Sequence, residues 1–308
     1  MADTSQTRLA YIAESVYGTT PATPTFKKVR YTGESLKHAR QNITSNEIRP
    51  DRNVADLVQV AGGAEGGVNF ELSYGTFDDF LESFMYSAWS SNVLKNGITP
   101  KSFSIEKTFE TGATDNFFRY TGMIANTFNL DISTQQIVTG SFGFMGKGGS
   151  VATTAISGAT YTDAPTYDVM NAGTNFASLA VTGVTSPKIT ALSLQGTNNL
   201  RQKPVVGSVE SLGVGAGRFV LTGTVTMYFE NKEAYDLFLA GTATDLTFTI
   251  GGASETNYEF VIPRLKFSDA DVATPGNDQD VMITLPFQAL YDPTEQCTLK
   301  ITRVPETP

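Results

Sequence analysis

The chain has 308 residues and a formal net charge of -9, with 40% hydrophobic, 11% aromatic and only 17% charged residues. This length can bury one large core or two medium ones, and the hydrophobic content excludes wholesale disorder. Acidic chains do not bind phosphate backbones by counterion release, so a nucleic-acid-gripping protein is excluded. Low surface charge also fits a protein that hides surface against copies of itself.

The first 25 residues are polar, and the pair Pro21 and Pro24 predicts an extended, irregular N-terminal arm (1–25) with at most a short helix over 8–16. Residues 1–17 lack a basic start followed by an apolar run, so we expect no signal peptide. No run of about 18 apolar residues occurs, so we expect no membrane insertion.

A strand pattern begins at Val29, and the polar stretch 39–56 predicts either a long loop or an extended hairpin arm. The glycines in 62–67 indicate a turn, and the strict alternation over 68–74 predicts a half-buried strand. Thr76 is the expected helix N-cap. Apolar residues then recur at helical spacing and predict a short core-facing helix: Phe77, Phe80, Leu81, Phe84 and Met85.

Strand patterns follow at 103–106, 117–132 and 137–145, and the last places Val138, Phe142 and Phe144 inward. Residues 151–186 are rich in Ala, Thr, Gly and Ser, which predicts a linker that contains small strands.

The second half repeats this order. A strand at 189–194 precedes a polar, Gly-rich stretch at 196–217 and an alternating strand at 220–229. Asn231 then caps an expected helix, and strands follow up to 304. We therefore predict two tandem copies of one unit, at 26–150 and 187–305.

The sequence gives little support for a catalytic function. His38 is the only histidine and stands among cations, so we expect it at the solvated surface, and the single cysteine, Cys297, is expected to be a buried structural thiol. A Ser-His-Asp or Cys-His mechanism would depend on His38, which has no carboxylate near it in sequence to orient it. Zinc sites built on His and Cys are excluded within one chain, which has one of each. The glycines of 146–150 lack the spacing of a phosphate loop. We expect no catalytic, cofactor-binding or metal site, and no enzyme.

One acidic cluster leaves several interpretations open: a solvated loop, an acidic lumen or contact element, or a calcium site whose spacing matches no helix–loop–helix motif. Pro275 and Gly276 predict a hairpin tip within it. The cluster comprises Asp269, Asp271, Asn277, Asp278 and Asp280.

Four passages, 29–36, 45–52, 69–81 and 142–146, together resemble the major tail tube proteins of long-tailed, non-contractile bacteriophages with double-stranded DNA. The likeness is good over 20–150 and loose over the second unit. It implies a mainly β (α+β) fold of β-sandwich or rolled-sheet units, each with one flanking helix. Sheets of neighbouring subunits would join into an inter-subunit β-barrel that lines a channel. Six single units usually form a ring, so a two-unit chain implies a trimeric pseudo-hexamer, with a hexamer as the alternative.

The resemblance implies a structural virion protein of the tail, assembled in the host cytoplasm, that needs no cofactor. Its partners would be itself, the tape measure protein, the tail terminator and the distal tail proteins, while double-stranded DNA passes through the lumen without specific binding. The alternatives are another tail or baseplate ring component, which copy number per virion would separate, and the tube protein of a related bacterial injection system.

The family's long loop between early strands reaches the adjacent ring, which here implies contact roles for about 39–67 and 196–217. Acids that face the lumen would keep DNA from sticking, and Asp269, Asp271, Asp278 and Asp280 are the acidic loop candidates. The candidates for inter-ring or inter-subunit contact are Arg40, Glu47, Arg49, Asp51, Arg52, Asp56, Arg201 and Lys203.

Overall fold

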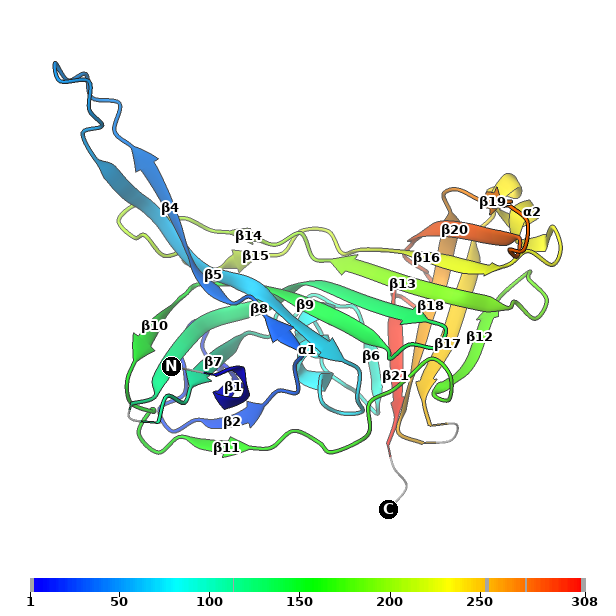
Figure 1. Ribbon diagram of the computed structural model, residues 1–308, viewed down its shortest axis with the longest axis horizontal. Helices are drawn as coiled ribbons and strands as arrows, with labels where there is room; N and C mark the ends of the chain where they lie inside the picture. Colours follow the sequence, from blue (N-terminus) through cyan, green and yellow to red (C-terminus); the bar gives the residue numbers. More distant parts are fainter. Residues whose placement is uncertain (1–2, 113, 253–254, 275, 306–308) are drawn as a thin grey trace.

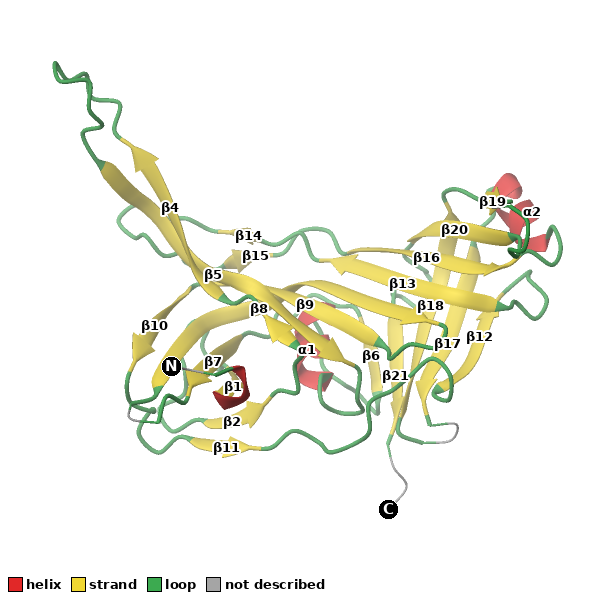
Figure 2. Cartoon of the chain, in the orientation of Figure 1, coloured by secondary structure: helices red, strands yellow, loops and turns green. Residues whose placement is uncertain are grey.

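The computed structural model describes residues 3–112, 114–252, 255–274 and 276–305, and these are mainly β-strand with two short α-helices (Figures 1 and 2). The mainly β fold expected from the sequence is confirmed. Strand pairing is almost entirely antiparallel, with one parallel pair between β11 and β2.

The first half of the chain forms a continuous ladder in the order β2–β1–β7–β8–β9–β5–β4. Its elements are η1 (Thr4–Gln6), β1 (Thr7–Ala13), β2 (Thr25–Lys28), β3 (Gly33–Glu34), β4 (Lys37–Thr44), β5 (Leu57–Glu71), α1 (Asp78–Met85), β6 (Val93–Lys95), β7 (Phe103–Phe109), β8 (Asn116–Ser133), β9 (Thr139–Gly146), β10 (Gly148–Ala152) and β11 (Thr160–Thr162).

The second half forms a ladder in the order β12–β17–β18–β20–β16–β13. Its elements are β12 (Phe176–Val181), β13 (Ile189–Thr197), β14 (Arg201–Gln202), β15 (Val214–Gly215), β16 (Val220–Tyr228), α2 (Glu233–Ala240), β17 (Thr244–Gly251), β18 (Asn257–Phe267), β19 (Asp271–Ala273), β20 (Met282–Ala289) and β21 (Lys300–Val304).

The long strand β8 joins the two halves. Its first part pairs with β7 on one side and β10 on the other, and its second part lies between β9 and β13. In the second junction, the C-terminal strand β21 lies between β18 and β6. The two halves therefore share hydrogen-bonded ladders at two places in the fold.

The core is apolar and rich in aromatic rings, because alternating strand residues and one helix face point into it. Val138, Phe142 and Phe144 are all buried, as predicted. Phe142 is fully buried, and its ring neighbours are Phe70, Phe77, Phe80, Phe128 and Phe144.

Both predicted helices are confirmed, although both begin differently from the expectation. The N-cap of α1 is Phe77, which makes no side-chain cap, and the Thr76 hydroxyl instead pairs with the Ser73 hydroxyl at 2.8 Å. In α2 the N-cap is Lys232 rather than the expected Asn231, and Lys232 makes no side-chain cap. The Asn231 side chain still accepts a 2.8 Å hydrogen bond from the Glu233 backbone amide at the start of the helix.

Three other expectations are wrong. Residues 7–13 form β1, with Leu9 and Ala10 buried, because this segment pairs along its full length with β7. The glycines of 62–67 lie inside β5 rather than in a turn. Gly66 has a φ of 141°, and a Cβ there would lie 2.4 Å from the Ser35 carbonyl oxygen. His38 is half-buried rather than at the solvated surface, with its ring 5.0 Å from that of Tyr120 in β8.

Truncating Phe142 should open a cavity at the centre of the aromatic cluster. We expect Phe142→Ala to lower the free energy of unfolding by about 3–5 kcal/mol in urea denaturation of the unassembled protein. Ile98→Ala is the control, because Ile98 is 91% exposed, and it should change stability by less than about 0.5 kcal/mol. Equal effects of the two variants would contradict this description of the core.

Candidate assembly surface

The β4–β5 hairpin projects from the body as a long arm (Figure 1), which settles the choice between a loop and a hairpin for 39–56. We call residues 40–62 the arm. The backbone amide of Ser45 donates to the Asp56 carbonyl at 2.9 Å, so the hairpin is held up to the base of its tip. The predicted contact residues on the arm are all exposed: Arg40, Glu47, Arg49, Asp51, Arg52 and Asp56.

The tip is shaped by one ion pair. The guanidinium of Arg49 donates to both carboxylate oxygens of Asp51, at 3.0 and 2.8 Å, and this holds the pKa of Asp51 well below its usual range. Arg52 follows with a left-handed φ of 60°. The tip is therefore an ordered turn that carries charge.

Apolar side chains also line the arm, where nothing in the described chain covers them. Ile48 is 97% exposed and Val54 is 71% exposed. Exposed apolar side chains grouped on a projecting element are typical of a contact surface. The others on the arm are Ile43, Leu57, Val58 and Val60.

The corresponding stretch of the second half, 198–219, folds back over the first half (Figure 1). The amide of Asn198 donates to the carbonyl oxygens of Phe84 and Ala125, at 2.8 and 3.0 Å. The Gly62 amide donates to the Val209 carbonyl at 2.6 Å, so this stretch reaches the base of the arm. Arg201 and Lys203 are exposed on it; the Arg201 guanidinium donates to the Ala216 carbonyl at 3.2 Å.

The acidic loop candidates lie at the opposite end of the molecule. Asp271 begins β19, which pairs with β20, and Asp269 lies just before it. Asp278 and Asp280 follow in the connection to β20, and all four are exposed. Within the described residues, no group of three or more His, Cys, Asp or Glu side chains could hold a metal ion. The expected tip at Pro275 lies outside the described residues.

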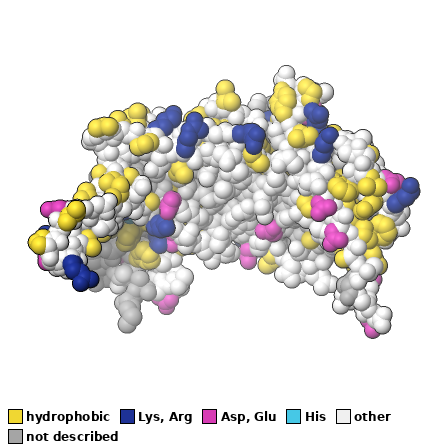
Figure 3. Space-filling view, turned by 90° about the horizontal axis from the view of Figure 1, so that it is seen from above, with side chains coloured by type: hydrophobic (Ala, Val, Ile, Leu, Met, Phe, Trp, Pro, Cys, Tyr) yellow, Lys and Arg dark blue, Asp and Glu magenta, His cyan; other side chains and the backbone are white. Residues whose placement is uncertain are grey.

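Viewed from above, hydrophobic side chains gather at both ends of the molecule, over the arm and over the end that carries α2 (Figure 3). Leu239 of α2 is 65% exposed, and Tyr228 and Phe229, which precede the helix, are 43% and 36% exposed. The two ends of the elongated chain thus both expose apolar surface.

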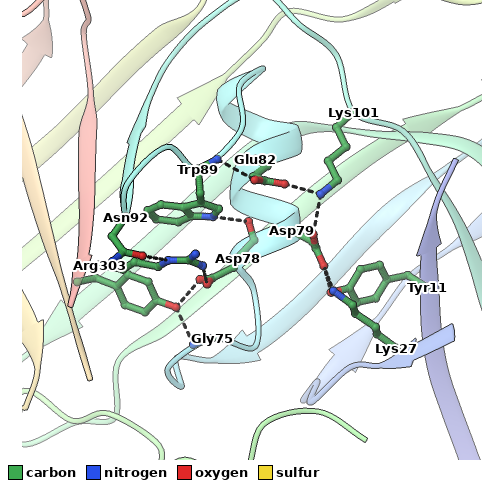
Figure 4. Close-up of polar contacts among 11 residues, drawn as sticks. Tyr11, Lys27, Gly75, Asp78, Asp79, Glu82, Trp89, Asn92, Lys101 and Arg303 are labelled. Atoms are coloured by element: carbon green, nitrogen blue, oxygen red, sulfur yellow. Dashed lines mark hydrogen bonds and ion pairs between the residues drawn. The ribbon is translucent and has the colours of Figure 1, made fainter. Parts of the chain in front are cut away.

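A polar network around α1 holds the two halves together (Figure 4). Asp78 accepts a 2.6 Å hydrogen bond from the Tyr258 hydroxyl and an ion pair from Arg303, both from the second half. The guanidinium of Arg303 also donates to the Asn92 side chain at 3.1 Å and lies over the Trp89 ring. Acids here also suit the positive end of the helix dipole.

The next residue along the helix ties α1 to the first half. Asp79 accepts from the Tyr11 hydroxyl at 2.9 Å, from Lys27 at 2.7 Å and from Lys101 at 2.6 Å (Figure 4). Burial raises the pKa of Asp79, but the two lysines outweigh burial and hold this pKa at about 2. Burial and the neighbouring Asp79 carboxylate also raise the pKa of Tyr11.

The sequence does not reveal this network, because the partners of Asp78 and Asp79 lie up to 225 positions away. The helix dipole was the only local signal for acids at this position.

The Asp79 ion pairs should make stability depend on pH. Because the folded-state pKa is depressed, this contribution is complete above about pH 4 and is lost as the pH falls toward 2. We expect wild-type unfolding free energy to fall by roughly 1–2 kcal/mol more than that of Asp79→Asn between pH 5 and pH 2.5. Asp163→Asn, at a site with an 82% exposed side chain, should keep the wild-type pH dependence.

Comparisons with known proteins give one positive result. Neither α-helix in the described part of the chain is long and apolar enough to cross a membrane. A search of curated proteins finds no match. The family model for the phage tail tube protein matches residues 4–289, which include the arm, both helices and the β8–β13 pairing between the halves. The chain therefore belongs to the phage tail tube protein family and is a structural component of the phage tail.

Proposed function

We propose that this chain is the major tail tube protein of a long-tailed, non-contractile phage, and that its copies close into rings that stack into a conduit for double-stranded DNA. One observation carries the proposal. The two halves of the chain are joined by strand pairing between β8 and β13, while the outer edges of β3–β4 and β19 pair on one side only within the described residues.

Unpaired strand edges are adhesive, because their backbone N–H and C=O groups can pair with another chain. A head-to-tail contact between one edge and the other satisfies both, and when such a contact closes into a ring neither of these two edges stays free. The β8–β13 pairing is an example of this contact already made inside one chain.

We further propose that the halves are tandem copies of one unit, at 26–150 and 187–305, with 151–186 as the connection. The shared order of pairing supports this: β7–β8–β9–β5–β4 in the first unit corresponds to β17–β18–β20–β16–β13 in the second. Each helix follows the equivalent strand, β5 or β16. Three chains then supply six units to a ring with pseudo-sixfold symmetry.

The arm is suited to contacts with other copies along the tube. It projects beyond the body and exposes apolar side chains, and such surface is stabilised by burial against a partner. The formal net charge of -9 is consistent with a wall that repels DNA phosphates rather than binding them.

Negative-stain electron microscopy of the concentrated protein tests the ring. We expect rings or tubes with a central hole, and a native mass of three chains per ring. A protein that stays monomeric at high concentration would contradict the proposal. Six chains per ring would keep the tube but remove the tandem-unit arrangement.

The arm can be tested separately from the ring. We expect Ile48→Ser with Val54→Ser to leave folding unchanged, because both side chains are exposed, and to reduce tube length at equal protein concentration. Val151→Ser is the control, since Val151 is 55% exposed but lies on β10 rather than on the arm. Normal tubes from the double variant would exclude a contact role for the tip.

A further inference from the structure

We propose that the seam between neighbouring chains copies the internal β8–β13 seam, so that the β3–β4 edge of one chain pairs antiparallel with residues 269–274 of the next, with Lys37 opposite Asp271. This inference rests on the proposed ring and adds the partner residues and their register. Its basis is the geometry of the seam that the chain makes with itself.

The internal seam is long and regular. β13 and β8 pair over seven consecutive residue pairs, from Ala191 opposite Ser133 to Thr197 opposite Thr127. Its large apolar side chains are buried, including Leu194 and Leu130, which stand opposite each other. A second seam of this kind would need the same two edges in equivalent positions.

A shared irregularity fixes which residues of the acceptor strands correspond. Between Tyr120 and Met123, β8 carries one residue more than β7 opposite it. Between Ile262 and Leu265, β18 carries one residue more than β17 in the same way. Met123 therefore corresponds to Leu265. Beyond this point, β8 carries one extra residue relative to β9, and the stretch from β18 to β19 carries one extra residue relative to β20. Residues 127–132 therefore correspond to residues 269–274.

The correspondence between the β3–β4 edge and β13 follows from the strands that each of them pairs with, β5 and β16. Val68 pairs with Phe142 and Val225 pairs with Leu285, which places the two valines on equivalent rungs. Opposite them stand Glu34 of β3 and Leu192 of β13. The segment 33–39 therefore corresponds to 191–197. In this register Leu36 lies opposite Val272 and Ala39 lies opposite Asp269.

Charges support this register. In the internal seam, Gln195 lies between Asn129 on β8 and Thr222 on β16, and all three are neutral. The equivalent residues between chains are Lys37, Asp271 and Glu65. Lys37 already pairs with Glu65 at 3.2 Å, and the incoming Asp271 would place a second carboxylate on its other side.

The helices give an independent observation. Phe84, the seventh residue of α1, is fully buried because the second half covers it: Gly196 lies against its ring and the Phe219 ring is 5.4 Å away. Leu239, the seventh residue of α2, is 65% exposed. A neighbouring chain docked in the proposed register would cover Leu239 as the second half covers Phe84.

Side chains occupy part of this edge before assembly. The Leu36 amide donates to the Glu34 carboxylate at 2.8 Å, and the Leu36 carbonyl accepts from the Tyr120 hydroxyl at 3.0 Å. A carbonyl oxygen can accept two hydrogen bonds, so the tyrosine can stay. The Glu34 carboxylate also forms an ion pair with Lys107. When the neighbour docks, this carboxylate would release the Leu36 amide and keep Lys107 as its partner.

Disulfide trapping tests the register. Ala39→Cys with Asp269→Cys should cross-link neighbouring chains in assembled rings, giving a ladder on non-reducing gels that stops at three chains. The internal equivalent, Thr197→Cys with Thr127→Cys, is the positive control and should cross-link within one chain. Ala39→Cys with Asp271→Cys, two residues out of register on the same face, should cross-link at least about fivefold less.

Charge exchange tests the pair itself. Lys37→Asp should raise the protein concentration needed for assembly by roughly fivefold or more, since it places three acids side by side, and adding Asp271→Lys should restore assembly. Rings that form normally but trap the shifted pair, or neither pair while the internal control cross-links, would overturn the proposed seam. Absence of any assembly in the wild type would instead overturn the proposed function, and the seam with it.

Discussion

The backbone hydrogen bonds of strand edges are the constraint on which this structure depends. Each edge carries N–H and C=O groups that need partners, and a chain built almost wholly of strands has many of them. Within the chain, β8 meets this need by extending past β7 and receiving β13 along its second part. The same requirement, applied to the β3–β4 and β19 edges, is the basis of the proposed ring.

The polar network around α1 connects this helix to both halves of the chain. Asp78 contacts Tyr258 and Arg303 of the second half, while Asp79 contacts Tyr11 of the first. With the β6–β21 pairing, this network holds the halves at a second place away from the β8–β13 seam. Two separate connections oppose hinge motion between the halves. A ring of fixed curvature would require the halves to stay fixed relative to each other.

The sequence predicted those elements whose signal is local. The helix at 78–85 follows from apolar residues at helical spacing, and β9 follows from the alternation that buries Phe142 and Phe144. The expectation of an irregular arm with at most a short helix over 8–16 was wrong, because residues 7–13 form β1. Its conformation is decided by pairing with β7, about 100 positions away.

The candidate assembly surface likewise has features that the sequence indicates and features that only the folded structure shows. Charged arm residues such as Arg49 and Asp51 were chosen because the family resemblance implies a long loop that reaches the adjacent ring, and both are exposed in the structure. The exposed apolar side chains of the arm, such as Ile48, were passed over, because only the structure shows that nothing covers them. Partners in the α1 network, such as Asp78 and Arg303, were beyond sequence reasoning because they are distant in the chain.

The central claim is that the β3–β4 edge and the β19 edge find their partners in neighbouring copies of this chain. Amide hydrogen exchange, compared between unassembled protein and purified tubes, measures this most directly. The account predicts strong new protection at 33–39 and 269–274 in the tubes, with the β8–β13 seam protected in both states. Equal exchange of these two edges in both states would contradict it.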